Sequence, residues 1–375
     1  MIKNIFRAVI LMEDMVDRVI KLELDEIETY GFPLDEVFGL EINYDNVKYC
    51  LITKLASNNK NLICFGPGAF QRDQRTSDGK LITPPFFSRW KWHKYFKESF
   101  ISYADPIFFY DEEIKVGWFV GTKDTWYLEV VSQIIKKIAI NQQIKNDNIL
   151  FFSSSAGGFA SICLGTLIKG SKVLVNNTQF NVLHYKKIHV DPLFEFLQKD
   201  FPDLSRSQIE EHLKYRLDVI ELFKRENYVP NITYYVNTAS DIDIYDHCIP
   251  FIEELKELPQ FNNYLTTYFY KEVKEKTHLP METNATVKFI REYVKQYLYN
   301  EEESFDNNLE NNLIKSTERI TKENDSHKLK ISSLEKENEE LLSKNNSLEK
   351  TNDEMLNSKS WKLTKPLRAF INLFR

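Results

Sequence analysis

The strongest constraint on the fold of this chain is a short apolar run that leads directly into a cluster of small residues. Residues 149–152 read Ile-Leu-Phe-Phe, as in a buried strand; residues 153–158 read Ser-Ser-Ser-Ala-Gly-Gly, and an apolar helix-like stretch follows. A sharp strand-to-helix turn exposes the side chain at its apex and needs small residues two positions before and after it. Ser153 and Gly157 meet this need around Ser155, so Ser155 is the candidate nucleophile.

The turn departs from the commonest G-x-S-x-G pattern, because Ser153 stands where that pattern has its first glycine. A serine is small enough for the position. The alternative interpretation is a phosphate-binding turn or a purely structural turn between a strand and a helix.

A nucleophilic serine needs a base and an acid that orients the base, and after such a turn they follow in the order Ser, Asp or Glu, His. Asp241 follows the apolar run 232–237, and His278 follows the run 265–270. We expect the His278 Nδ1 to donate to Asp241, and its Nε2 to take the serine proton.

Other residues compete for both roles. Asp243 and Asp246 lie in the same loop as Asp241, and His247 is the second choice for the base. The position of a residue within a loop does not follow from the sequence, so these alternatives stay open.

An oxyanion needs N–H donors, which come from the residue after the nucleophile and from a loop after an early strand. Ala156 supplies the first donor. The run 61–65 is followed by Gly-Pro-Gly-Ala, so the amide of Gly68 or Ala69 is the expected second donor. No Gly-Lys-Ser or Gly-Lys-Thr follows, which argues against a phosphate loop.

Cations and indoles gather shortly after this glycine-rich loop. Such side chains suit sugars or anionic phosphates. The alternative is a packed loop with solvated charges. The candidate substrate-binding residues are Arg72, Arg75, Arg89, Trp90 and Trp92.

Short apolar runs alternate with helical patterns along the first 300 residues, which predicts an α/β fold with a mainly parallel sheet flanked by helices. A helical segment is expected over 1–30, the main domain over 31–299, and a helical cap insertion over about 186–228, with a capping box at 205–208. The expected strands are 47–55, 61–65, 106–110, 149–152, 172–176, 232–237 and 265–270, and the expected helices include 125–140 and 285–297.

The composition changes over 300–358, which holds one aromatic residue and neither glycine nor proline. Apolar residues recur there every seven positions, while the partner heptad positions are mostly polar. This pattern predicts a coiled coil that forms a parallel homodimer; the alternatives are a solvated single helix and a disordered tether. The core series is Leu313, Ile320, His327, Leu334, Leu341, Leu348 and Met355, and its partner series is Thr317, Asn324, Ile331, Asn338, Asn345 and Asn352.

The tail over 359–375 has five cations, no acid and several large apolar residues. A segment of this kind can lie in the headgroup region of an anionic membrane. The alternative partner is a polysaccharide-assembly enzyme on which the tail docks.

Bulk properties limit the function classes. The net charge of −6 and the pI near 5.8 do not favour a nucleic-acid binder. The four scattered cysteines favour neither structural zinc nor a disulfide framework, and no metal site is expected. Neither a signal peptide nor a membrane-spanning run is evident, which predicts a cytoplasmic protein, peripheral at the inner face of the membrane if the tail binds lipid.

Three motifs carry a resemblance to a known group of proteins: the turn at 152–160, Asp105-Pro106, and Gly-Trp-Phe-Val-Gly at 117–121. Across about 45–290 the chain resembles α/β-hydrolase-like proteins of bacterial capsule and surface-polysaccharide gene clusters. It resembles more distantly the acetyltransferase of accessory Sec systems, which modifies adhesin glycans. Residues 357–368 are similar to the tails of many bacterial glycosyltransferases.

This resemblance implies a serine-dependent acyltransferase or esterase that acts on a surface glycan or its lipid-linked precursor. No permanently bound cofactor is expected, and the acyl donor is left open. The alternatives are a non-catalytic glycan-binding scaffold and a glycosyltransferase-like enzyme, for which Asp241-Ile242-Asp243 matches the DxD pattern only in letters.

Overall fold

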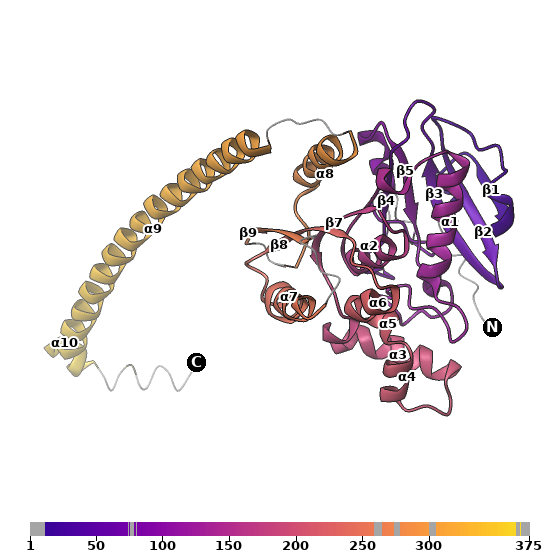
Figure 1. Ribbon diagram of the computed structural model, residues 1–375. Coiled ribbons are helices and arrows are strands. Elements are labelled where there is room, and N and C mark those ends of the chain that lie inside the picture. The colour runs from indigo at the N-terminus through magenta and orange to yellow at the C-terminus, as the bar shows by residue number, and fades with distance from the viewer. Residues whose placement is uncertain are drawn as a thin grey trace. The chain divides into compact units, whose positions relative to one another are not determined.

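A computed structural model describes residues 12–73, 75, 79, 81–258, 265–273, 278–299, 305–364 and 368, with the backbone alone over 305–329 and at 361. The chain divides into two compact units, 1–301 and 302–375 (Figure 1). The first holds a sheet with helices around it. The second holds the long helix α9 (Phe305–Asn357) and the short α10 (Lys359–Leu363).

The described part of the first unit contains a nine-stranded sheet in the order β1-β2-β3-β5-β4-β6-β7-β8-β9. β2 runs antiparallel to β3, and β3 to β5, while the other neighbouring strands are parallel. This arrangement confirms the predicted α/β-hydrolase-like fold. The strands are β1 (Val19–Glu23), β2 (Val37–Tyr44), β3 (Val47–Lys54), β4 (Leu62–Phe65), β5 (Ser99–Tyr103), β6 (Ile149–Ser155), β7 (Lys172–Thr178), β8 (Asn231–Asn237) and β9 (Leu265–Tyr270).

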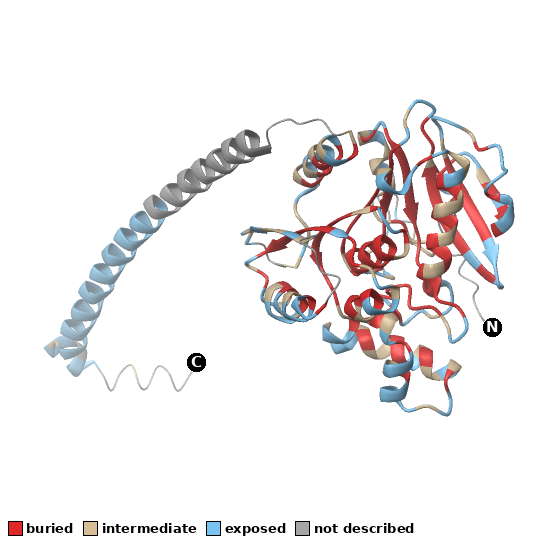
Figure 2. Ribbon diagram, in the orientation of Figure 1, coloured by how far each residue is buried: buried red, intermediate tan, exposed pale blue. Residues whose placement is uncertain are grey.

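Helices cover both faces of the sheet, so the central strands are buried throughout (Figure 2). Successive strand residues point to opposite faces. Leu62 and Cys64 of β4 share a core cluster with residues of α1 (Tyr127–Asn141) and α2 (Ala156–Leu167). Ile63 and Phe65 belong to a second cluster with α8 (Thr283–Leu298). Burial on both faces explains why these strands read as continuous apolar runs.

The predicted helical cap follows β7 and consists of short helices. It comprises η6 (Val182–His184), α3 (Lys187–Asp200), α4 (Arg206–His212), α5 (Lys214–Leu217) and α6 (Val219–Glu226). The capping box is confirmed, since the Gln208 amide donates to Ser205 Oγ at 3.4 Å and the Ser205 amide donates to Gln208 Oε1 at 2.8 Å.

Two predicted elements are wrong. Residues 106–110 are not a strand: Pro106–Phe109 forms the 3-10 helix η4, because Asp105 Oδ1 accepts the Ile107 amide and caps its start, and the strand lies earlier as β5. The described part of 1–30 is not a helix either. It contains β1, which pairs with β2, between the short 3-10 helices η1 (Met12–Asp14) and η2 (Leu24–Glu26).

In the second unit, the described side chains of the predicted coiled-coil core face solvent in the single chain. Leu334, Leu341 and Leu348 are 55%, 59% and 60% exposed. Most of the basic tail beyond residue 364 lies outside the described residues. Among the described helices, none is long and apolar enough to cross a membrane.

Candidate active site

The turn between β6 and α2 has the strained geometry of a nucleophile elbow. Ser155 has φ 55° and ψ −133°, a backbone conformation that residues other than glycine rarely adopt. A side chain at Gly157 would collide with Ser153 Oγ and lie 2.7 Å from the carbonyl oxygen of Pro67. One at Gly158 would collide with Thr178. The two glycines are therefore needed for the turn to pack against the loop after β4 and the end of β7.

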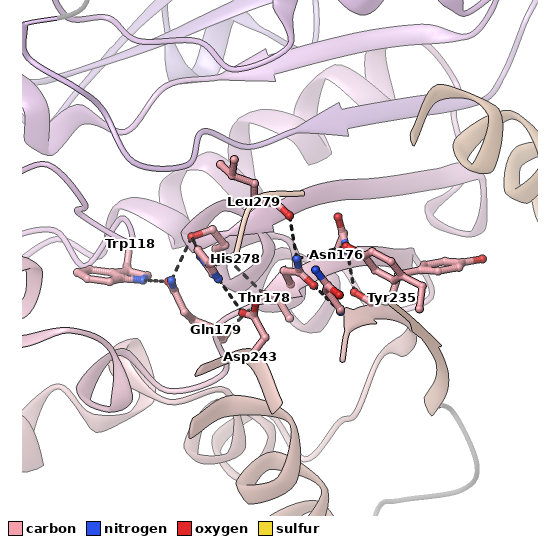
Figure 3. A network of polar contacts seen from close by, with 12 residues as sticks. Trp118, Asn176, Thr178, Gln179, Tyr235, Asp243, His278 and Leu279 are labelled. Carbon is pink, nitrogen blue, oxygen red and sulfur yellow. Dashed lines mark hydrogen bonds and ion pairs between the residues drawn. The ribbon is translucent and has the colours of Figure 1, made fainter. Parts of the chain in front are cut away.

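The structure brings Ser155 together with His278 and an aspartate, and the last two are labelled in Figure 3. His278 Nε2 lies 2.9 Å from Ser155 Oγ, and His278 Nδ1 lies 2.7 Å from Asp243 Oδ1. A carboxylate only accepts hydrogen bonds, so Nδ1 must be the donor and Nε2 is left to accept the serine proton. The hydrogen bonds run from the serine to the histidine and from the histidine to the acid, which is the arrangement that serine-dependent acyl transfer requires.

The aspartate in this arrangement is Asp243, which corrects the expectation that Asp241 would hold the histidine. After β8 the chain enters the π-helical segment η7 (Ile242–Cys248), followed by α7 (Ile249–Lys256). On this segment Asp243 faces inward and is fully buried, whereas Asp241 and Asp246 are exposed. The inner face of η7 therefore decides which acid reaches His278.

The loop that carries His278 is attached to the end of β7. The Asn177 side-chain amide donates to the Leu279 carbonyl at 3.1 Å, and the Met281 amide donates to Asn176 Oδ1 at 2.9 Å. Figure 3 shows Asn176, near the end of β7, and Leu279 of this loop. These contacts hold the loop at the carboxyl end of β7, where His278 reaches Ser155.

His247, the second choice for the base, is buried near His278 but does not contact the serine. Burial lowers the pKa of His247 to about 3, with smaller contributions from the charges of His278 and His184. Its ring packs against Tyr185, with the ring centroids 6.1 Å apart. It remains a neutral packing residue.

The candidate oxyanion donors are reduced to two. The Gly68 amide donates to Ser88 Oγ at 3.3 Å, so this donor is already engaged. Ala69 lines the cavity beside His278, and Ala156 directly follows Ser155. The end of β6 is joined to the loop after β4, because Ser153 Oγ donates to the Gly66 carbonyl at 2.8 Å. Of the three candidates, Ala69 therefore lines the cavity, Ala156 directly follows the serine, and the Gly68 amide is engaged by Ser88.

Gln179, a fully buried residue directly after β7, was not predicted from the sequence as part of the site. Its Nε2 donates to Ser155 Oγ at 3.1 Å, and its Oε1 accepts from Trp118 Nε1 at 2.7 Å (Figure 3). The available signal was a polar residue at the carboxyl end of a buried strand next to the nucleophile strand, where ligands and functional groups collect in α/β sheets.

The loop that carries Trp118 is itself held by Asp105, at the start of η4. Asp105 Oδ2 accepts the Phe119 amide at 2.8 Å, and burial raises the pKa of Asp105 to about 7. A side chain at Gly117 would collide with Ile107 and lie 2.5 Å from Asp105 Oδ2. The motifs at 105–106 and 117–121 thus form one support for Gln179.

The five residues expected to bind substrate do not line the cavity beside His278, which corrects the expectation from the sequence. Arg72 donates to the carbonyls of Phe108, Asp111 and Ile114 and so closes a loop. Two other arginines also form hydrogen bonds within the chain: Arg75 donates to the Gly79 carbonyl at 2.9 Å, and Arg89 donates to Ser153 and Ser154 at 3.3 and 2.7 Å. The two tryptophans pack against buried apolar residues, Trp90 against a small core cluster and Trp92 edge-on against Phe65.

A cavity of about 730 Å³ opens beside His278. Ala69, Tyr185 and Leu279 are among its lining residues, whereas none of the five candidates lines it. Its size exceeds that of a small acyl group, so it has room for a larger part of a substrate.

No protein-family model and no curated protein sequence matches this chain. Solved structures do match. A capsule O-acetyltransferase of Neisseria meningitidis serogroup A, in complex with CoA, aligns with a TM-score of 0.51 and 12% identity over 68% of this chain and 94% of that one. The likeness concerns the fold and at that level confirms the resemblance indicated by the sequence.

Two other solved structures are similar at lower scores. A serine hydrolase of Staphylococcus aureus that binds fluorophosphonates aligns at TM-score 0.44 and 11% identity, over 71% of this chain and 99% of that one. A Glycosylation Associate Protein complex of Streptococcus agalactiae aligns at 0.45 and 12%, over 68% of this chain and 46% of that one.

Proposed function

We propose that this chain is a serine acyltransferase that moves an acyl group onto a hydroxyl of a bacterial surface glycan or its precursor. The observation that carries the proposal is the hydrogen-bonded series from Ser155 Oγ through His278 to Asp243, at 2.9 and 2.7 Å. Such a catalytic triad activates the serine hydroxyl, because the buried acid fixes the histidine tautomer and the histidine can then take the serine proton.

The reaction proceeds in two steps. His278 Nε2 takes the Ser155 proton while Oγ attacks the acyl carbonyl; the donor's leaving group departs with that proton, and an acyl-serine remains. In the second step His278 takes the proton of the acceptor hydroxyl, whose oxygen attacks the acyl-serine. The bond to Ser155 Oγ breaks, and His278 returns the proton to this oxygen. The amides of Ala156 and Ala69 stabilise the oxyanion in both steps. With water as acceptor, the same residues make an esterase.

Transfer to a glycan is favoured over hydrolysis by two considerations. The expected cytoplasmic location suits the building of a glycan rather than its trimming. The structurally similar capsule O-acetyltransferase was solved in complex with CoA, so acetyl-CoA is the first acyl donor to test.

Labelling with a fluorophosphonate probe tests the proposal, since such probes react with activated serines. We expect peptide mapping by mass spectrometry to place the label on Ser155. Ser155→Ala should lose the label although Ser153 and Ser154 remain beside it, and its circular dichroism spectrum should be unchanged. No labelling of the native chain would favour the non-catalytic scaffold, and labelling that persists in Ser155→Ala would place the nucleophile elsewhere.

The second unit is proposed to assemble and locate the enzyme. The exposed Leu334, Leu341 and Leu348 would pair two α9 helices in parallel, and the basic tail would then present two copies to an anionic membrane. Two weak membrane contacts joined in one dimer bind far more strongly than either alone.

A further inference from the structure

Two segments far apart in the sequence bring two lysines and a histidine to the cavity beside His278. Lys115 directly precedes the Trp118 loop, and Lys186 and His189 lie at the start of α3 in the cap. All three line the cavity. Lys115 is also tied to the loop after β4, because its carbonyl accepts the Phe70 amide at 2.7 Å. Lys115, Lys186 and His189 therefore form one side of the cavity, which is called the basic wall below.

His189 is the neutral member of this group of three cavity-lining residues. Burial lowers the pKa of His189, and the charges of Lys115 and Lys186 lower it further, which favours the neutral imidazole. The ring stacks on Tyr185 at a centroid distance of 5.5 Å, which fixes its place in the wall.

The two lysines are exposed, and among the described residues neither forms an ion pair with a carboxylate. One acid, Asp73, also lines the cavity. It does not approach either lysine within ion-pair distance in the described structure, so the wall keeps an excess of positive charge that a substrate can meet.

We propose that Lys115, Lys186 and His189 bind a phosphate group of a substrate, within reach of the reaction at Ser155. The inference rests on the proposed acyl transfer and names the chemistry of one of its substrates. Lysine binds phosphate as a point charge, and an imidazole N–H can donate a hydrogen bond to a phosphate oxygen. The phosphate could belong to a donor such as acetyl-CoA or to a phosphorylated glycan precursor.

Direct binding of inorganic pyrophosphate to the full chain tests the wall without using activity. Calorimetry should show binding that weakens as salt is added, because exposed charges are screened. In Lys115→Ala/Lys186→Ala the Kd should rise about tenfold or more. Lys186→Arg should keep most of the affinity, because it keeps the charge.

The matched control is Lys48→Ala/Lys214→Ala, which removes two exposed, ion-paired lysines that do not line the cavity. Its Kd should equal that of the native chain. An unchanged Kd in the Lys115/Lys186 variant, or an equal loss in the control, would overturn the phosphate site. Fluorophosphonate labelling of Ser155 would still support the acyl-transfer proposal in that case, so the two failures are distinguishable.

Kinetics then identify the source of the phosphate. If the donor carries it, KM for acetyl-CoA should rise in the Lys115/Lys186 variant while KM for S-acetyl-N-acetylcysteamine, which has no phosphate, changes little. If the acceptor carries it, the variant should lose its preference for a sugar phosphate over the free sugar. Equal changes for the charged and uncharged partners in both comparisons would contradict a phosphate site.

Discussion

Trp118 Nε1 donates a hydrogen bond of 2.7 Å to Gln179 Oε1, and this contact determines which end of the Gln179 amide faces Ser155. An indole nitrogen can only donate, so the amide oxygen must lie on the Trp118 side. The Gln179 NH₂ group is thereby directed at Ser155 Oγ, 3.1 Å away. It can hold the serine rotamer and stabilise negative charge that develops on Oγ.

Replacing either residue of this pair should therefore slow acyl transfer. We expect Gln179→Met to reduce kcat by about tenfold to a hundredfold, because one preorganised donor is removed. Trp118→Phe should have a smaller effect in the same direction. Trp126→Phe is the matched control, since Trp126 is equally buried and its Nε1 makes no hydrogen bond to the described residues. A comparable loss in the control would mean that Trp118 acts only through packing.

The choice of acid is tested by two neighbouring substitutions. Asp243→Asn should lower kcat by about 10³–10⁴-fold, because an amide no longer fixes the His278 tautomer or stabilises its cation. Asp241→Asn should leave kcat within about twofold, since this side chain is exposed. Steady-state hydrolysis of 4-nitrophenyl acetate measures both. The reverse order of effects would restore Asp241 as the acid.

His247 should make the fold sensitive to acid. Its pKa is about 3 in the folded chain against 6.5 ordinarily, so between these values the unfolded chain binds more protons and the fold loses stability as pH falls. Between pH 7 and pH 5 this amounts to about 2 kcal/mol.

Asp105 acts in the opposite direction in the same range. Burial raises its pKa to about 7, so its contribution is greatest at low pH and is lost as pH rises through 7. The quantity to measure is therefore the difference between variants. Relative to the native chain, His247→Phe should gain stability on going from pH 7 to pH 5 in urea unfolding. His212→Gln, at an exposed histidine, is the control; the same gain there would contradict the assignment to His247.

The pairing of α9 helices is tested within the full chain. Leu341→Ser should weaken the dimer, because Leu341 belongs to the heptad core series, and light scattering should report a shift toward the monomer. Leu342→Ser is the control, since Leu342 is equally apolar and 64% exposed but lies off that series. A monomeric native chain at micromolar concentration would contradict the coiled-coil prediction.

The tail is expected to bind anionic vesicles through electrostatics and inserted apolar side chains together. Each cation near such a surface contributes about 1 kcal/mol before screening. Co-sedimentation of the full chain should weaken with salt and should fall when Trp361 and Phe370 become alanine. A chain that ends at Ser358 should remain in the supernatant. Equal pelleting of the two chains would rule out the tail, and negligible pelleting of both would favour docking on a partner protein.

Local patterns in the sequence determined several features of this protein. The strand, the elbow at Ser155 and the following helix are encoded within about twenty adjacent residues, because the close packing at Gly157 and Gly158 depends on the absence of side chains there. The position of His278 after the last strand, and the heptads of α9, are equally local signals, since each depends on spacing along one segment.

Only the tertiary structure decided which loop side chains reach the serine. Asp241 and Asp243 are two residues apart and chemically identical, and the inward face of η7 selects between them. The role of Gln179 depends on Trp118, 61 positions away, and Arg72 donates to the carbonyls of a loop 36–42 positions away. Loops have no periodicity that would predict side-chain direction, so their contacts follow only from the packing of distant segments.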